Sequence, residues 1–397
     1  MPTRRQWMLA AIVFVASVAL MLFITVGTTG PMIDVDVYLL AGQGFFHGVD
    51  LYRDGFGSTL TTPLPYTYPP VWAAVVSTVA WLPWRSVAWG WTLLNVALLV
   101  WLVRTSYQRL LDRLGTWMPL ALAALVAITA FTAPVMGTFD VGQVGLFLTV
   151  LVLADVLRAP TRLPQGVLVG VATAIKLTPG LFCVYWAATR RRRAAAIAAG
   201  MAVGLWLVTA ALRPDLSTTY WLHIAFRGDR TTEDLGIGIN QSIEGSLQRV
   251  GWTSLLPYLA AAGIVLVVAL RRSRSAHLSG DELAAVTMIG LATLLISPVS
   301  WIHHAIWIVP ASGVVLGDGR ARARRVAWAV VTVMFLLRIP LWSWSGALPT
   351  TWLTAPLLDN AYVWTYLVLL LALPITPARA PGEAGTEQAA VAATARG

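Results

Sequence analysis

Residues 7–27 read WMLAAIVFVASVALMLFITVG, and this stretch decides the class of fold. It holds no charged residue and is long enough to cross the hydrocarbon core of a bilayer as a helix, which needs about 20 apolar residues. Arg4 and Arg5 precede it, and no small-residue cleavage site follows it. We therefore expect a retained first transmembrane helix rather than a signal peptide that is removed.

The rest of the chain repeats this apolar pattern. Of its 397 residues, 57% are hydrophobic and 12% are charged, and the mean hydropathy is +0.71. These values exclude ordinary soluble, disordered and collagen-like classes. We predict an all-α, polytopic integral membrane protein in which residues 1–376 form one transmembrane domain of about twelve helices. The apolar stretches lie at about 7–27, 69–83, 86–103, 117–135, 141–157, 164–188, 193–212, 254–270, 283–297, 299–316, 326–345 and 361–376.

The basic residues set the expected orientation. A net charge of +10 in a soluble protein would favour a nucleic-acid partner, but here the arginines gather in short connectors, as they do in cytoplasmic loops. We therefore expect membrane lipid and no nucleic acid as partners. The clusters that we place inside lie at residues 4–5, 190–193, 271–274 and 320–325.

With these clusters inside, both termini are cytoplasmic and three segments are large external loops: about 28–68, 213–253 and 346–360. The tail at 377–397 has no pattern that could form a core and is expected to be a disordered cytoplasmic segment. The connectors around Arg109 and Arg158 fall outside in this twelve-span arrangement, which conflicts with their charge.

The first external segment is unusually polar. It begins IDVDVY at residues 33–38, so Asp34 and Asp36 follow the first span at its external end. A carboxylate beside a low-dielectric wall can act as a general base towards an alcohol, because burial and neighbouring charges tune its affinity for protons. The alternative is a carboxylate that caps a helix or is solvated.

Four more side chains stand where spans begin. The run LPYTYPP at 64–70 is a rigid turn into the second span, in which Tyr66 and Tyr68 are scaffold or line a sugar site. The run GTFDVGQVGLF at 137–147 places Asp140 and Gln143 at the start of another span. These two either cap the helix or form hydrogen bonds with the hydroxyls of a sugar.

One basic residue stands apart from the arginine clusters. Lys176 is the single lysine of the chain and lies in AIKLTPG at 174–180, within an apolar stretch where an ionisable group is costly and usually functional. A fixed cation there fits the phosphate of a lipid-anchored molecule. The alternative is a lysine that snorkels or pairs with Asp140 or Asp155.

The second large external loop mixes both signs of charge. Asn240 and Gln241 offer donors and acceptors suited to hydroxyl recognition, and Arg227, Arg230 and Arg249 are candidates to hold a phosphate. For each arginine the alternative is a solvated loop surface.

Two adjacent histidines lie in SPVSWIHHAIW, between two late spans. Because neighbours on a helix point about 100° apart, His303 and His304 do not form a paired metal site, and we predict no metal. One of them is a candidate to contact a phosphate or a catalytic carboxylate. Packing against Trp301 and Trp307 is the alternative.

The motifs IDVDVY, GVDLY, LPYTYPP, FDVGQ, AIKLTPGLF, NQSIEGSLQR and LLISPVSWIHHAIWIVP, in this order, resemble those of polyprenol-phosphate-mannose-dependent alpha-1,2-mannosyltransferases of the GT-C superfamily, in the actinobacterial PimE-like group. The resemblance covers about residues 7–316. It implies a multi-pass enzyme of the cell membrane that takes mannose from polyprenyl-phosphate-mannose on the extracytoplasmic side. The implied acceptor is an envelope glycolipid, either a phosphatidylinositol mannoside or lipomannan, and no cofactor is implied because the donor is a substrate.

The resemblance also implies roles. Asp34 matches the family's catalytic aspartate, Asp36 ranks second, and either His303 or His304 lies near the lipid phosphate. A beta-linked donor and an alpha product imply inversion by a single displacement, with one base. Lys176, a histidine and a loop arginine would then stabilise the departing phosphate.

Two alternatives stay open at this stage. A GT-C arabinofuranosyltransferase that uses decaprenyl-phosphate-arabinose would share the fold and most of the motifs. A flippase or transporter of lipid-linked sugars would instead place polar residues along a path through the membrane midplane. The acids and amides of this chain concentrate in or beside the expected external loops, which disfavours transport.

Overall fold

The structure is a computed structural model that describes residues 1–28, 32–53, 55–57, 64–158, 162–225, 234–347, 351 and 354–377. Within these residues the chain is helical, and one isolated bridge between Asn240 and Trp301 is the sole extended pairing. The all-α prediction is confirmed. The predicted disordered tail falls almost wholly on residues 378–397, which lie outside the described residues, and stays a prediction.

Six helices of the described chain are long and apolar enough to cross a membrane. Their outer faces carry large apolar side chains, such as Leu207 at 65% and Ile264 at 66% exposed, as lipid-facing helices do. The chain is therefore a polytopic membrane protein. The six are α1 (Arg4–Thr28), α4 (Trp84–Ser106), α5 (Gln108–Leu114) with α6 (Met118–Ala130), α11 (Arg192–Leu212), α14 (Leu255–Leu278), and α17 (Arg322–Leu337) with α18 (Ile339–Trp344).

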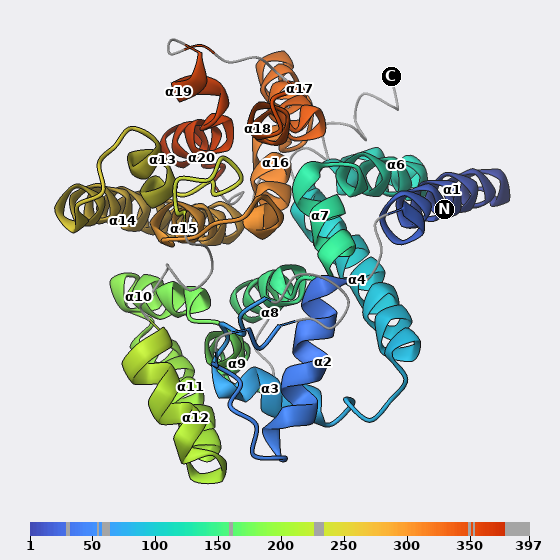
Figure 1. Ribbon diagram of the computed structural model, residues 1–397. Coiled ribbons are helices and arrows are strands. Elements are labelled where there is room, and N and C mark those ends of the chain that lie inside the picture. The colour runs from blue at the N-terminus through green and yellow to red at the C-terminus, as the bar shows by residue number, and fades with distance from the viewer. Residues whose placement is uncertain are drawn as a thin grey trace, which may run out of the picture.

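A seventh apolar unit is broken, because α7 (Ala133–Val141) and α8 (Gly145–Leu157) meet at an angle of 116°. The other apolar stretches are also helical but shorter, so the count of twelve spans stays a prediction. Figure 1 gives their arrangement. The shorter helices are α2 (Ile33–Phe45), α3 (Pro70–Ser77), α9 (Val167–Ile175), α10 (Leu181–Ala188), α12 (Pro214–Thr219), α13 (Ile243–Arg249), α15 (Glu282–Ile296), η5 (Ile302–Trp307), α16 (Ile308–Leu316), α19 (Ala355–Leu358) and α20 (Ala361–Ala372).

The arginine clusters gather at one end of the bundle, and the two conflicting connectors lie there as well. Arg109 pairs with Asp281 in the α14–α15 turn at 2.9 Å. Gly166, in the connector that follows Arg158, packs so closely against α11 that a Cβ would lie 2.3 Å from the carbonyl oxygen of Ala194. The twelve-span arrangement placed both connectors at the opposite end. It differs because the chain after α3 stays at the end opposite the arginine clusters. Gln43 Nε2 on α2 donates to the Ala80 carbonyl at 3.1 Å, and Arg213, which follows α11, donates to the Val49 carbonyl at 3.0 Å. α4 therefore runs the other way.

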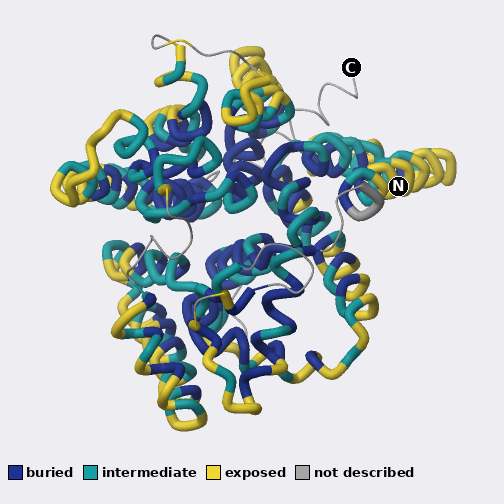
Figure 2. The backbone as a smooth tube through the Cα atoms, in the orientation of Figure 1, coloured by how far each residue is buried: buried dark blue, intermediate teal, exposed yellow. Residues whose placement is uncertain are grey.

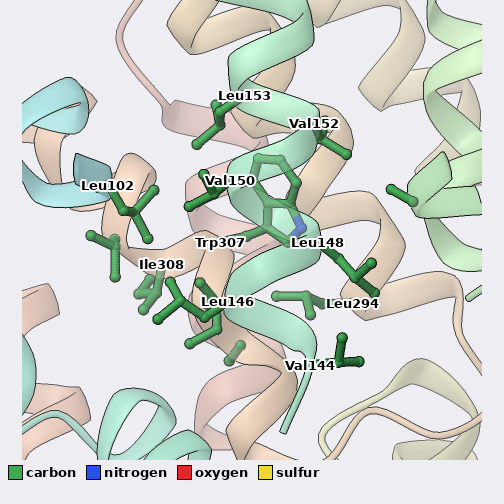
Figure 3. Packing of buried hydrophobic residues seen from close by; sticks show 14 of the residues in the cluster. Leu102, Val144, Leu146, Leu148, Val150, Val152, Leu153, Leu294, Trp307 and Ile308 are labelled. Carbon is green, nitrogen blue, oxygen red and sulfur yellow. The ribbon is translucent and has the colours of Figure 1, made fainter. Parts of the chain in front are cut away.

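Exposure follows the expected pattern for a membrane bundle. Exposed residues run along the outer helices α1, α11, α14 and α17, while the interior, with α8, α15 and α16, is buried (Figure 2). At the centre, the indole of Trp307 lies among Leu146, Leu148, Val150 and Leu294 (Figure 3). Trp307 also stacks on Phe182 with ring centroids 5.3 Å apart. This anchor fixes the end of η5.

Gly290 of α15 leaves the space that Trp307 fills. A Cβ at this position would lie 2.0 Å from Trp307 Cδ2, so we expect Gly290→Ala to destabilise the protein by about 1 to 3 kcal/mol through overpacking. The midpoint of thermal unfolding in detergent should fall accordingly. The matched control is Gly263→Ala on α14, where a Cβ meets nothing within 4 Å and the midpoint should not fall. Equal midpoints for both variants would contradict this account of the core.

Candidate active site

A cavity of about 1210 Å³ opens among the helix ends that lie opposite the arginine clusters. The C-terminal ends of α1 and α15, the N-terminal ends of α2 and α14, the helix α7 and the junction of α17 and α18 contribute to its wall. It collects seven of the side chains singled out from the sequence: Asp34, Tyr68, Asp140, Gln143, Lys176, His303 and His304.

The bend between α7 and α8 brings Gln143 to Asp34. Gly142 ends α7 with φ +73°, a left-handed conformation that glycine adopts without steric cost. A Cβ there would also lie 2.4 Å from Val35 Cγ2, so glycine lets α2 approach the bend. Gln143 Nε2 donates to Asp34 Oδ2 at 2.6 Å. Asp34 itself stands in the first turn of α2, where the helix dipole favours a carboxylate.

Hydrogen bonds to its oxygen fix the orientation of the Gln143 amide. Gln143 Oε1 accepts hydrogen bonds from Tyr68 Oη at 2.6 Å, from Tyr38 Oη at 3.0 Å and from the Val144 N–H at 3.0 Å. The amide nitrogen is therefore the group that faces Asp34. Within the described chain, Asp34 Oδ1 has no hydrogen-bond partner, so one carboxylate oxygen is held and the other is available to the cavity.

The surroundings of Asp34 tune its proton affinity. Burial raises the pKa of Asp34 from 3.8 to about 7, although the positive charge of Lys176 opposes this rise. A carboxyl group with a pKa near neutrality is an efficient general base at physiological pH, because it is both ionised in part and basic enough to take a proton.

Lys176 and His304 form a pair of donors that face each other. Lys176 follows α9, at the tip of the α9–α10 hairpin, and its Nζ lies 3.3 Å from His304 Nε2. His304 Nδ1 accepts from the Trp301 N–H at 3.2 Å, so the hydrogen of the neutral ring is on Nε2. Both groups are thus donors. An anion fits this arrangement, because one of its oxygens can accept from both.

The contacts of Lys176 do not support the alternative, a lysine that snorkels or pairs with Asp140 or Asp155. Its Nζ lies 5.3 Å from the centroid of the Tyr68 ring, and within the residues that the structure describes it makes no ion pair. Asp155 is instead occupied by Arg158 at 2.8 Å and by the N–H groups of Gly166 and Val169. In the described chain Lys176 therefore lines the cavity without a direct ion pair, and its charge acts on Asp34 at longer range.

His303 differs from its neighbour. Its ring meets that of His304 edge to face, with centroids 4.8 Å apart, and its Cβ packs on Gly137 of α7. Its backbone oxygen accepts from Thr138 Oγ1 at 3.1 Å. Both histidines line the cavity, but His304 is the one that joins Lys176.

Asn240 and Gln241 lie outside the cavity wall, contrary to the expectation of hydroxyl recognition. Asn240 Nδ2 donates to the Pro298 carbonyl at 3.1 Å, and its Oδ1 accepts from the Ser300 N–H at 2.9 Å. The Gln241 side chain donates to two backbone carbonyls and accepts from the Tyr362 N–H at 3.1 Å. The Asn240 amide clamps the turn that leads into η5 and so positions the histidines, whereas the Gln241 amide ties this loop to the turn between α19 and α20.

Arg249, Tyr66 and Asp36 also do not line the cavity. Arg249 is held by backbone carbonyls between residues 236 and 240 and by Asn360 Oδ1 at 2.6 Å. Tyr66 is fully buried. Asp36 is buried on another face of α2, because two residues are about 200° of helical rotation. Arg227 and Arg230 lie outside the described residues.

Two residues of the cavity wall, Tyr38 and Arg338, are not among those predicted from the sequence. Tyr38 lies one helical turn after Asp34, so the i, i+4 spacing on α2 places it on the same face. Arg338 is an ionisable residue inside the apolar stretch 326–345, which is the same signal that drew attention to Lys176. Both line the cavity.

Comparison with known proteins identifies the family of the chain. The model of glycosyltransferase family 87 matches residues 66–298, which include Tyr68, Gln143 and Lys176. No solved structure matches the chain.

Among curated relatives, the chain is similar to polyprenol-phosphate-mannose-dependent alpha-(1-2)-phosphatidylinositol mannoside mannosyltransferases. One, from Mycobacterium tuberculosis, is 29% identical over 93% of this chain and 90% of the relative. Another, from Mycolicibacterium smegmatis, is 30% identical over 86% and 83%. A third, named for a phosphatidylinositol pentamannoside and also from Mycolicibacterium smegmatis, is 33% identical over 81% and 78%. Since the family match spans more than half of the chain, this protein belongs to glycosyltransferase family 87.

Proposed function

We propose that this glycosyltransferase moves mannose from polyprenyl-phosphate-mannose to an envelope glycolipid, a phosphatidylinositol mannoside or lipomannan, with inversion and an alpha-1,2 linkage. The observation that carries the proposal is the cavity wall, on which a carboxylate at Asp34 and the donor pair of Lys176 and His304 both lie. The names of the relatives support the donor and the acceptor class.

In the proposed step, Asp34 Oδ1 takes the proton from an acceptor hydroxyl as that oxygen attacks the anomeric carbon of mannose. The bond from the anomeric carbon to the acceptor oxygen forms while the bond to the phosphate oxygen breaks. Gln143 holds the other carboxylate oxygen and so fixes the direction of the base. Because attack and departure occur on opposite faces of the sugar, a beta-linked donor gives an alpha product.

The leaving group departs with the bonding electrons as a polyprenyl phosphate anion. Lys176 Nζ and His304 Nε2 would donate to its oxygen, where negative charge develops in the transition state. Phosphate is stable as an anion, so no general acid is needed.

We also propose that the reaction takes place on the extracytoplasmic side of the cell membrane. The cavity lies at the helix ends opposite the arginine clusters, and the positive-inside rule places those clusters in the cytoplasm. In this GT-C-type arrangement α3 does not cross, whereas α9 and α10 each count as one crossing, so that both termini are cytoplasmic. The twelve proposed crossings are α1, α4, α5 with α6, α8, α9, α10, α11, α14, α15, α16, α17 and α20.

The direct test is transfer by the purified protein in lipid nanodiscs. Polyprenyl-phosphate-mannose with radiolabelled mannose and a phosphatidylinositol mannoside acceptor should give a product that a linkage-specific mannosidase identifies as alpha-1,2. The same assay with decaprenyl-phosphate-arabinose should give none. Transfer of arabinose in place of mannose, by well-folded protein, would overturn the proposed donor.

The pH dependence of the rate tests the role of Asp34. Because the base must be ionised and the pKa of Asp34 is about 7, kcat/KM should fall about tenfold per pH unit below that value and level off above it. Initial rates at a fixed low acceptor concentration measure this profile. A rate that stays flat far below neutrality would contradict Asp34 as the base.

A further inference from the structure

We propose that Arg338 forms a second anion site in this cavity, which binds the phosphodiester of an anionic lipid acceptor. The inference rests on the proposed function only for the identity of the acceptor. Arg338 lies at the junction of α17 and α18, outside the family match, and lines the cavity.

The contacts of Arg338 are unlike those of other half-buried arginines. Its guanidinium donates to the thioether sulfur of Met136, a weak acceptor, and it makes no ion pair with any residue that the structure describes. Arg249 and Arg272, by contrast, donate to backbone carbonyl oxygens, and Arg109 pairs with Asp281. A guanidinium has five N–H donors, so most of those of Arg338 are available to a ligand.

The backbone at Arg338 points to the same conclusion. Its φ and ψ of 54° and 37° are left-handed, a conformation that is costly for a residue with a Cβ and that clusters at functional sites. The left-handed residue ends α17 and directs the chain into α18. It also sets Arg338 and Leu341 on the cavity wall.

Arg338 lies at the depth in the membrane where lipid headgroups lie. α17 begins within the arginine cluster at 320–325, so Arg338 stands at the opposite membrane surface. The tryptophans at 342 and 344 follow on α18, each 53% exposed, and tryptophan is enriched at membrane–water interfaces. A phosphate at this depth is accessible to the guanidinium without crossing the hydrocarbon core.

Geometry separates this site from the base at Asp34. α17 and α18 lie on one side of the molecule and α2 and α9 on the other, with α7 and α8 between them (Figure 1). On α7, Met136 contacts Arg338, and Gly142 at its end contacts Val35 beside Asp34. Because six residues of helix lie between them, Met136 and Gly142 are about 9 Å apart along the axis of α7.

That separation decides which phosphate each cation binds. The donor phosphate is bonded to the carbon under attack, so it must lie beside the hydroxyl that Asp34 deprotonates, as Lys176 does. A phosphate at Arg338 is several ångströms away from the reacting carbon, and sugar must fill the space between. An acceptor glycolipid meets this condition because its phosphodiester is separated from the attacked hydroxyl by sugar. The cavity of about 1210 Å³ is larger than a typical site for one small ligand.

The kinetic test compares two acceptors, a phosphatidylinositol dimannoside and an alkyl dimannoside that lacks phosphate. In Arg338→Asn, which suits a left-handed backbone, we expect the KM for the phosphodiester acceptor to rise about 10-fold to 100-fold. The KM for the alkyl dimannoside and the KM for the donor should stay unchanged. Arg338→Lys should restore part of the loss, and Arg322→Gln, at the other end of α17, should behave as wild type.

A binding measurement separates this inference from the proposed function. Detergent-solubilised wild type should retain radiolabelled phosphatidylinositol, and Arg338→Asn should retain much less of it, with no turnover required. Equal retention, or an equal KM rise for both acceptors, would overturn the inference. A rise in the donor KM alone would also overturn it, since it would place the donor phosphate at Arg338. If wild type transfers mannose to neither acceptor, the proposed function fails, and retention alone decides the role of Arg338.

Discussion

Asp34→Asn should abolish measurable transfer, with turnover reduced about 100-fold to 10,000-fold, the usual contribution of a general base. The substitution is nearly isosteric, and an asparagine oxygen can still accept from Gln143 Nε2, which donates at 2.6 Å in the wild type. The contacts of Gln143 with Tyr68 and Tyr38 are untouched. The variant should therefore fold and bind the lipid-linked donor as wild type does. Single-turnover rates and donor binding by the same preparation measure both expectations.

Asp36→Asn is the matched control, because it makes the same chemical change two residues away on the same helix. Asp36 is buried and does not line the cavity, so this variant should retain most of its turnover. Any loss should accompany a lower unfolding midpoint. The opposite result, with full activity in Asp34→Asn and none in Asp36→Asn, would transfer the role of base to Asp36.

Much of the fold follows from apolar length alone, but chain direction does not. The stretch at 7–27 is a single long helix, as its composition requires. The stretch at 69–83 has a similar composition, yet only Pro70–Ser77 is α-helical. Hydropathy measures the preference of a segment for lipid and does not show whether the segment crosses, so it predicts a span at 69–83, where the start of α3 lies beside the cavity. The Arg109–Asp281 pair, which corrects the topology, joins residues that are far apart in the sequence.

The site was predictable where a residue is out of place in its own segment. Lys176 and Asp34 are charges beside or within apolar stretches, and both line the cavity. Asn240 and Gln241 stand in a polar loop, where sequence alone cannot distinguish an amide that binds a sugar from one that binds backbone. Their partners, at residues 298–300 and 359–362, are placed by tertiary folding.

Lys176→Gln should lower kcat about 100-fold to 1,000-fold, because in the proposed step it removes a fixed charge from the place where the phosphate becomes an anion. Glutamine keeps a donor of similar length, so the loss reports the charge. His304→Gln should also lower kcat, and the double variant should lose less than the product of the two single losses, since both donors act on one oxygen.

The unfolding temperature of Lys176→Gln distinguishes a role of Lys176 in the reaction from a structural role. In the described part of the chain Lys176 makes no direct ion pair, although its charge acts on Asp34 at longer range. A buried cation without a direct partner destabilises a folded protein. Lys176→Gln should therefore unfold at the same temperature as wild type or at a higher one, while its activity collapses. A substitution that keeps or raises the unfolding temperature and lowers activity is expected at a site where activity is gained at the expense of stability. A lysine that merely held α9 against η5 would give the reverse pattern, with a lower unfolding midpoint and a kcat close to that of the wild type.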